Sequence, residues 1–321
     1  MSVDGAALGV RLRERDLSSA PAVLNLLEST AAADREQSAR LLAEVSPAAL
    51  GGEAPGHVIG VTGPPGAGKS TLLSALLHRW RELGQTVAVL AVDPSSRRSG
   101  GSLLGDRARI EFDPADRGVF IRSTSSGERH GGLAWATRSG AQALAAAFDA
   151  VVVETVGVGQ AETDIADVAD TVAVVVQPGS GDVLQFLKSG IMEIPDVLVV
   201  TKSDLGQIAL SARRDLAAAL RSLGRRHTPV LAVSSLAPAS GIHELAAALA
   251  DHRGEIDIGA RRLAARRAGA LRDFAVEYGE HGMRLVGGRS EAEKWLTRQD
   301  PKLNIPALFD CLRERMSERA Q

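Results

Sequence analysis

The residues with the clearest chemistry lie in the stretch GPPGAGKST, residues 63–71. The stretch matches the pattern G-x-x-x-x-G-K-[ST], follows the apolar run VIGVT at 58–62 and precedes an apolar helical pattern. Glycines allow backbone N–H groups to turn toward a phosphate, and the following helix points the positive end of its dipole at the same anion. The sequence therefore predicts a nucleotide-phosphate site, in which Lys69 contacts the β- and γ-phosphates and Ser70 ligates Mg²⁺. The residues of this loop are Gly63, Pro64, Pro65, Gly66, Ala67, Gly68, Lys69, Ser70 and Thr71.

Two further apolar runs end in acids that can supply the oxygen ligands Mg²⁺ prefers. Asp93 follows the run at 86–92, and Glu154 ends the run at 149–154. An acid at the end of a buried strand beside a phosphate loop is what Mg²⁺ coordination requires in this kind of site. Gly157 completes an acid-x-x-Gly pattern, and its N–H can approach a γ-phosphate.

A polar, glycine-rich stretch at 94–109 lies between two expected strands, and loops of this length are usually functional. It contains Asp106 and Arg109, three residues apart. One interpretation is a mobile switch, with Asp106 on Mg²⁺ directly or through water and Arg109 as a candidate for the γ-phosphate. The other is an ion-paired surface helix without a catalytic role.

A second motif selects the base. Residues 201–204, TKSD, follow the apolar run at 196–200 and match T-K-x-D. The carboxylate of Asp204 can accept hydrogen bonds from N1–H and N2–H₂ of guanine, a donor pair that adenine lacks, which predicts GTP and GDP as ligands in preference to ATP. Thr201 stands where Asn is commoner and can partly replace its amide through the hydroxyl, while the stem of Lys202 can cover the base. A last run at 229–233 leads to Ser234, Ser235 and Leu236, whose backbone can contact guanine O6.

The alternation of apolar runs with helical patterns predicts an α/β fold, a doubly wound and mostly parallel sheet of the P-loop NTPase type. We expect an N-terminal helical extension at 1–52, the P-loop domain at 53–254 and a C-terminal helical region at 255–321. The net charge of −2 gives no electrostatic case for nucleic acid or membrane partners. The single cysteine fits a reducing compartment, so a cytoplasmic location is expected. The apolar faces of the C-terminal helices predict a homodimer.

The stretch from Gln177 to Met192, QPGSGDVLQFLKSGIM, follows another apolar run but matches no phosphate motif. Its glycines permit rearrangement, and Asp182 and Lys188 can exchange ion-pair partners as it moves. We interpret Gln177, Asp182 and Lys188 as a coupling switch. The alternative is a solvated segment whose charges have no such role.

Together these motifs resemble the methylmalonyl-CoA mutase-associated GTPases of the MeaB/ArgK type, in the SIMIBI class of P-loop GTPases. The resemblance rests on the stretches at 63–71, 91–109, 154–162, 177–194 and 201–204, and it covers roughly 20–250. It implies GTP hydrolysis with Mg²⁺ and no tightly bound organic cofactor, and a C-terminal dimerisation element. It also implies a chaperone role for a cobalamin-dependent acyl-CoA mutase, in which hydrolysis gates adenosylcobalamin loading and protects or reactivates the mutase.

Two alternatives stay open at this point. One is a nickel metallochaperone GTPase of the same class, although the His residues are scattered and there is one cysteine. The other is a kinase or ATPase that serves a transport system, which the TKSD motif disfavours. The residues after about 255 depart from the family pattern, so the geometry of a dimer and the choice of mutase are not predicted.

Overall fold

The computed structural model describes residues 3–93, 110–125, 133–155, 164–179 and 194–320. The chain divides into two compact units. The first, which we call the sheet unit, is Gly56–Ile256, and the second, the helical unit, combines Met1–Pro55 with Asp257–Gln321.

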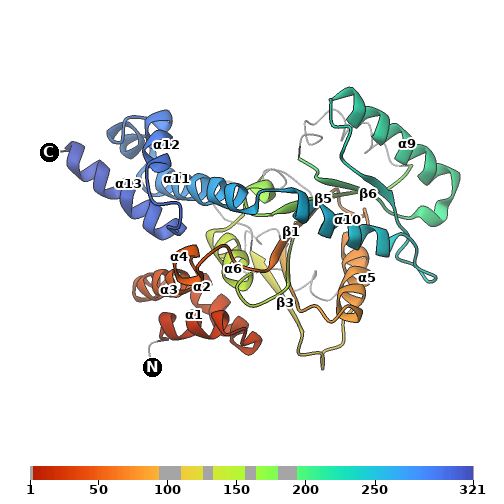
Figure 1. The fold of residues 1–321 in the computed structure, drawn as a ribbon, viewed down its shortest axis with the longest axis horizontal. Coiled ribbons are helices and arrows are strands. Elements are labelled where there is room, and N and C mark those ends of the chain that lie inside the picture. The colour runs from red at the N-terminus through yellow and green to blue at the C-terminus, as the bar shows by residue number, and fades with distance from the viewer. Residues whose placement is uncertain (1–2, 94–109, 126–132, 156–163, 180–193, 321) are drawn as a thin grey trace, which may run out of the picture. The chain divides into compact units, whose positions relative to one another are not determined.

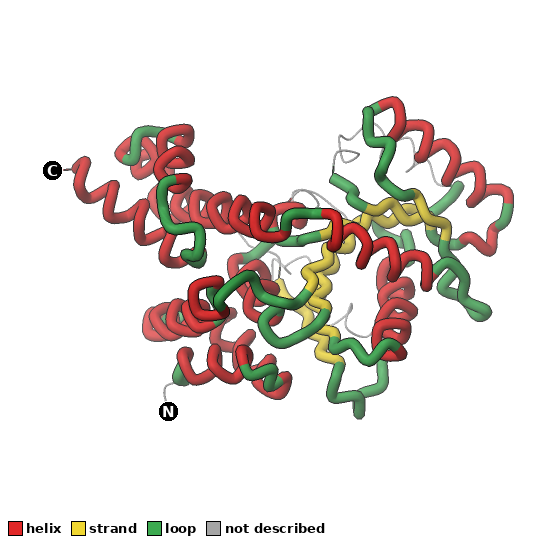
Figure 2. Tube along the Cα trace, viewed as in Figure 1, coloured by secondary structure: helices red, strands yellow, loops and turns green. Residues whose placement is uncertain are grey.

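The sheet unit contains, within the described residues, a seven-stranded sheet in the order β3-β2-β4-β1-β5-β6-β7, with every neighbouring pair parallel (Figures 1 and 2). The predicted doubly wound parallel sheet is therefore confirmed. Because β1 lies between β4 and β5, the chain leaves its carboxyl end at the place where successive crossovers change direction, which is where ligands bind in such sheets. The strands are β1 (His57–Thr62), β2 (Val87–Asp93), β3 (Val119–Ser125), β4 (Ala150–Thr155), β5 (Thr171–Val176), β6 (Val197–Val200) and β7 (Val230–Ala232).

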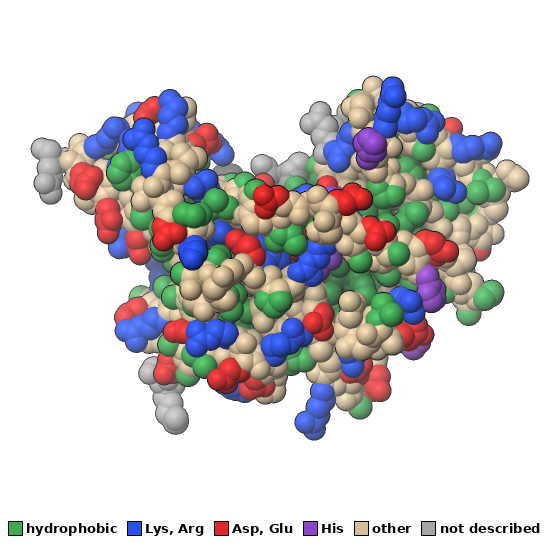
Figure 3. Space-filling view, viewed as in Figure 1, with side chains coloured by type: hydrophobic (Ala, Val, Ile, Leu, Met, Phe, Trp, Pro, Cys, Tyr) green, Lys and Arg blue, Asp and Glu red, His purple; other side chains and the backbone are tan. Residues whose placement is uncertain are grey.

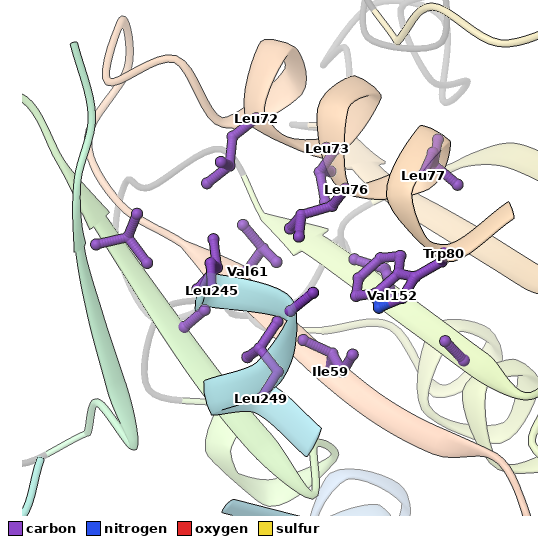
Figure 4. Close-up of a cluster of buried hydrophobic side chains, with 14 of the residues drawn as sticks. Ile59, Val61, Leu72, Leu73, Leu76, Leu77, Trp80, Val152, Leu245 and Leu249 are labelled. Carbon is purple, nitrogen blue, oxygen red and sulfur yellow. The ribbon is translucent and has the colours of Figure 1, made fainter. Parts of the chain in front are cut away.

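Helix α5 (Lys69–Glu82) carries apolar residues at helical spacing and directs them into the core (Figure 4). They meet alternate strand residues such as Ile59 and Val152, together with Leu245 and Leu249 of α10 (Ile242–Glu255). Burying one such side chain contributes about 1.5–3 kcal/mol, so this cluster fixes the start of α5 against the end of β1. The α5 residues are Leu72, Leu73, Leu76, Leu77 and Trp80.

Other helices complete the sheet unit. Helix α6 (Trp135–Leu144) packs on β2 and β4, and α9 (Gln207–Ser222) packs on β6 and β7. The short 3₁₀ helices are η3 (Ile165–Asp167) and η5 (Ser203–Leu205). Strand β3 extends beyond its apolar residues Val119–Ile121 into a polar stretch. Strand β3 continues to Ser125 because it pairs with β2 as far as Asp93, and the ladder compensates for the polar side chains.

The helical unit is built from two groups of helices. Near the N-terminus are α1 (Gly5–Arg13), η1 (Leu17–Ser19), α2 (Ala20–Glu28), α3 (Ala32–Glu44) and α4 (Pro47–Leu50). Near the C-terminus are α11 (Ile258–Leu285), which kinks at Gly279, α12 (Arg289–Thr297) and α13 (Ile305–Ala320). Arg266 joins the groups through a two-pronged ion pair with Glu53, with both N–O distances 2.9 Å. Over the described residues, no helix is long and apolar enough to span a bilayer.

The apolar faces of α11, α12 and α13 pack against one another. Their buried cluster includes Phe274, Leu296 and Leu308, with Tyr278 and Phe309 at its edge. The rings of Phe274 and Tyr278 lie 4.8 Å apart. Much of the apolar surface from which the sequence predicts a dimer is therefore buried within the unit itself.

Candidate nucleotide-binding site

The predicted phosphate loop connects the carboxyl end of β1 to α5, and its glycines have backbone conformations that other residues rarely adopt. The φ angles are +142° at Gly63, +76° at Gly66 and +86° at Gly68. At Gly63 both the φ angle and the available space require glycine, because a Cβ there would lie 1.9 Å from the carbonyl oxygen of Val175 on β5. The loop thus lies tightly against the neighbouring strand, and a side chain at Gly63 would displace it.

The start of α5 is open to an anion. Its N-cap residue is Gly68, and no side chain among the described residues caps the helix. The N–H groups of the first turn therefore have no side-chain acceptor within that set, and the helix dipole adds positive potential at the same place. Lys69 is 7% exposed, and its amino group donates to the carbonyl oxygens of Gly63 (2.7 Å) and Pro64 (3.1 Å). The ammonium group thus lies on the loop that is predicted to hold the phosphates.

The structure brings together two of the predicted Mg²⁺ ligands. Ser70, in the first turn of α5, donates a hydrogen bond from its hydroxyl to Oε1 of Glu154 at 3.1 Å. Glu154 is 5% exposed and lies on β4, paired with Val61 of β1 and Ala91 of β2. A hydroxyl and a carboxylate oxygen beside a phosphate loop form a donor set that suits Mg²⁺, so the residues present fit this ion.

The remaining predicted catalytic and metal residues are only partly described. Asp93 ends β2, the strand next to β4, so its backbone lies at the same edge of the sheet as Glu154. Its side chain lies outside what the structure describes, as do Asp106, Arg109 and Gly157 altogether.

The predicted base motif, residues 201–204, follows β6 and forms hydrogen bonds with the phosphate loop. The hydroxyl of Thr201, which is 4% exposed, donates to the carbonyl oxygen of Ala67 at 2.7 Å. The amino group of Lys202 lies 3.3 Å from the carbonyl oxygen of Gly66. Lys202 itself has a φ of +55°, unusual for a residue with a side chain. Two motifs far apart in the sequence therefore share one backbone loop, as a nucleotide that spans both would require.

The carboxylate of Asp204 is exposed, and a neighbouring residue orients it. Oδ1 accepts a hydrogen bond from the hydroxyl of Ser234, at 2.8 Å. Ser234 is 4% exposed and is held by paired backbone hydrogen bonds to Ser240 of 3.0 and 2.9 Å. The sequence predicted a backbone contact of Ser234 with guanine but missed this side-chain role. The only feature of the sequence that could have indicated this role is a serine that directly follows the last apolar run, at 229–233.

The residues after Ser234 lie beside α5. A pocket of about 640 Å³ is lined by Ser235 together with Thr71 and Ser74 of α5. Leu236 is 62% exposed. Residues predicted for the nucleotide site on two distant segments thus border one cavity.

The predicted coupling switch begins at this site. The side-chain carbonyl oxygen of Gln177 accepts a hydrogen bond from the amino group of Lys202. Two residues later, a Cβ on Gly179 would meet the side chain of Ile208 at 3.4 Å. Asp182 and Lys188 lie outside the described residues. The contact of Gln177 with Lys202 was not predicted, because nothing in the local sequence specifies which strand lies beside β5.

Three features together define a P-loop GTPase: a phosphate loop that precedes an uncapped helix, an acid on the adjacent strand and a T-K-x-D motif that hydrogen-bonds to the loop. Comparison with known proteins agrees. The family model described as methylmalonyl Co-A mutase-associated GTPase MeaB matches residues 20–278, and the chain belongs to this family. It is a GTPase that binds guanine nucleotide, and the resemblance found in the sequence is confirmed.

Three known proteins illustrate the similarity. A protein of Pyrococcus abyssi named as a GTPase is 41% identical over 250 residues, which cover 76% of this chain and 74% of that protein. The mouse protein named methylmalonic aciduria type A homolog, mitochondrial, is 42% identical over 175 residues, 52% of this chain and 41% of that one. The solved structure of an LAO/AO transport system kinase superposes with a TM-score of 0.65 and 27% identity, covering 98% of this chain and 97% of that one.

Proposed function

We propose that this GTPase serves a cobalamin-dependent acyl-CoA mutase, methylmalonyl-CoA mutase or a relative of it. In this role GTP hydrolysis gates the loading of adenosylcobalamin and protects or reactivates the mutase. The supporting observation is the family match over residues 20–278, because the description of that family names association with methylmalonyl-CoA mutase. The mouse relative is named for methylmalonic aciduria, which concerns the same acyl group.

The chemistry is the attack of water on the γ-phosphorus of GTP, which gives GDP and phosphate. Charge that develops on the transferring group is stabilised by the N-terminal N–H groups of α5 and by Lys69. For this, the ammonium group of Lys69 exchanges the carbonyl oxygens of Gly63 and Pro64 for phosphate oxygens. When bound, Mg²⁺ neutralises charge on the β- and γ-phosphates, and Ser70 and Glu154 would hold it, with Asp93 and Asp106 as further proposed ligands.

We assign recognition of the guanine base to the carboxylate of Asp204, which accepts a hydrogen bond from the hydroxyl of Ser234. Thr201 keeps this motif in register with the phosphate loop through its hydrogen bond to Ala67. We assign the backbone of Ser235 and Leu236 to the guanine O6 side. The amino group of Lys202 is engaged by Gly66 and Gln177, so its stem, and not its charge, is the part proposed to cover the base.

Coupling to the mutase is assigned to the segment that begins at Gln177. Lys202 contacts the phosphate loop at Gly66 and this segment at Gln177, so it links the nucleotide site to the switch. Such contacts between exposed groups contribute about 0–1 kcal/mol, small enough for a partner surface to bias them. Asp182 and Lys188 are proposed to exchange ion-pair partners further along.

We also infer a cytoplasmic homodimer that involves the C-terminal helices. The resemblance supports the dimer, and Val276, 53% exposed on α11, offers apolar surface for it. We also propose that the domain boundaries lie at 52/53, between the N-terminal helical extension and the P-loop domain, and at 254/255, between that domain and the C-terminal helical region.

The test combines this protein with a purified cobalamin-dependent mutase and measures transfer of adenosylcobalamin in the presence of GTP, GDP or a non-hydrolysable GTP analogue. The proposal expects transfer that depends on which nucleotide is bound. Equal transfer under all three conditions would refute the gating role.

One second candidate has a specific observation in its favour. The LAO/AO transport system kinase superposes over almost the whole chain. A kinase transfers the γ-phosphate to a protein acceptor, so radiolabel from γ-labelled GTP or ATP would appear on a protein. Release of all label as inorganic phosphate excludes this candidate.

A further inference from the structure

Outside the nucleotide site, the helical unit contains a buried arginine that forms no direct ion pair with a described carboxylate. Arg315 of α13 is only 8% exposed. Its Nε–H has no hydrogen-bond acceptor, and no described carboxylate lies within the 4.0 Å ion-pair distance of its guanidinium. Buried charges in proteins are normally paired, so this arrangement needs an explanation.

A second unpaired donor lies beside it. The guanidinium of Arg315 is stacked on the ring of Trp295 of α12, 4.5 Å from its centroid. The indole Nε1–H of Trp295 is also buried, and no described residue accepts from it. The cation–π contact compensates part of the charge but leaves both N–H groups unsatisfied. Two donors in one place indicate a missing acceptor.

Further positive charge surrounds this pair. The guanidinium of Arg319, one turn further along α13, lies against the turn before α12, where a Cβ on Gly287 would be 2.6 Å from its Nη1. Burial, followed by the charge of Arg319, lowers the pKa of Arg315; Glu291 opposes this shift, and Arg298 adds to it. The acid at this place, Glu291, pairs with Lys294 at 3.0 Å, and the charges of Lys294, Arg315 and Arg319 all lower its pKa. Cations therefore exceed acids around the stack, although Glu318 lies within electrostatic range of Arg315.

The start of α12 adds backbone donors. The helix has nine residues, its N-cap is Gly288 with a φ of +84°, and no described side chain caps it. Its first-turn N–H groups thus face the same region as Arg319. Figure 3 shows Lys and Arg side chains, with a few acids between them, over the part of the surface where Figure 1 places α12.

We propose that Arg315 and Arg319, with the N-terminal turn of α12 and Arg298 at the edge, bind the phosphate group of a phosphate monoester. A carboxylate ligand fits less well than a phosphate. Glu291 already supplies one carboxylate here, and the arginines still outnumber the acids. A phosphate dianion offers three acceptor oxygens and more charge, which matches two guanidinium forks and a helix N-terminus. The site shares no residue with the phosphate loop, so the inference does not depend on the proposed function.

The test uses the indole N–H signal of Trp295 in the full-length protein. The chain has three tryptophans, so ¹⁵N-labelled protein gives three indole signals, and Trp295→Phe identifies the relevant one. The phosphate loop is filled with GDP, and inorganic phosphate and glycerol 3-phosphate are then titrated at constant ionic strength. We expect a saturable shift of the Trp295 signal with both probes.

Arg319→Gln is the main variant, because Arg319 is exposed and its replacement leaves the core intact. It is expected to weaken binding about tenfold, through loss of a charge-assisted hydrogen bond. Arg313→Gln is the matched control, because Arg313 is exposed on the same helix but pairs with Asp310 at 2.9 Å. It is expected to bind as wild type does.

Three results would overturn the proposal. The first is the absence of a saturable shift of the Trp295 signal, and the second is an equal affinity in Arg319→Gln and wild type. The third is a shift produced by a poly-glutamate peptide but not by either phosphate probe, which would assign the site to carboxylates.

Discussion

Ser234 offers a sensitive test of the base site, because its hydroxyl donates a hydrogen bond to the carboxylate of Asp204, which is proposed to bind the guanine. The donor–acceptor distance to Asp204 Oδ1 is 2.8 Å. Ser234→Ala removes this bond and a longer one of 3.4 Å that the hydroxyl accepts from the N–H of Leu236, but leaves the backbone pairing of residue 234 with Ser240 in place. The fold should therefore be retained, and the carboxylate should become free to rotate.

The expected magnitude follows from the type of bond. A hydrogen bond to a charged group contributes about 1.5–3 kcal/mol, and Asp204 is exposed, so water replaces part of it. We expect a loss of about 1–2 kcal/mol in the binding of GDP, which is roughly a 5- to 30-fold increase in Kd. IDP lacks the N2 amino group and gains less from an oriented carboxylate, so its Kd should rise less and the preference for GDP over IDP should narrow.

The assay is calorimetric titration of GDP and IDP into both proteins. Ser203→Ala is the control, because Ser203 is adjacent to Asp204 but its hydroxyl lies only near that of Ser240, at 3.4 Å. An unchanged GDP affinity in Ser234→Ala would refute the idea that Ser234 orients Asp204. So would an equal loss in the Ser203→Ala control.

Four further predictions concern the same site. Lys69→Ala should weaken GTP binding or turnover by at least about tenfold in nucleotide-binding and phosphate-release assays, because it removes a charge-assisted contact to the phosphates; wild-type values would exclude Lys69 from the site. Asp204→Asn should shift the preference from GTP toward XTP, because an amide can donate to xanthine O2; competition binding in which GTP still outcompetes XTP contradicts it. Glu154→Ala should lower kcat and make nucleotide binding less dependent on Mg²⁺, and unchanged hydrolysis across a Mg²⁺ titration removes Glu154 from the metal site. Gln177→Ala should keep normal GTP affinity and intrinsic rate but lose stimulation by the mutase, as should Asp182→Ala and Lys188→Ala. The control Gln207→Ala, at an exposed glutamine at the start of α9, should behave as wild type; switch mutants that all respond normally would show that this segment is not the switch.

The backbone of the phosphate loop could be predicted from the sequence because its requirements are local. Gly63, Gly66 and Gly68 have φ angles that glycine adopts without strain, and the loop lies between an apolar run and a helical pattern. The same holds for Glu154 at the end of a strand. In each case the residue type and its position after or within one strand are enough to predict the local structure.

The contacts between the motifs could not be predicted in this way. Thr201 and Ala67 are 134 residues apart in the chain, and Ser234 and Asp204 are 30 apart. Their meeting depends on the order β1-β5-β6-β7, which the local pattern does not specify. The Arg315–Trp295 stack was missed for a similar reason, because it requires the packing of α13 on α12.

The proposed partnership of this GTPase with a cobalamin-dependent acyl-CoA mutase can be tested by single-turnover GTP hydrolysis. The rate is measured for the protein alone and with a purified mutase in excess, with Lys69→Ala as the inactive control. We expect slow intrinsic hydrolysis that the mutase accelerates about tenfold or more, as activating partners do for other GTPases. A rate that is the same with and without every cobalamin-dependent acyl-CoA mutase tested would contradict it.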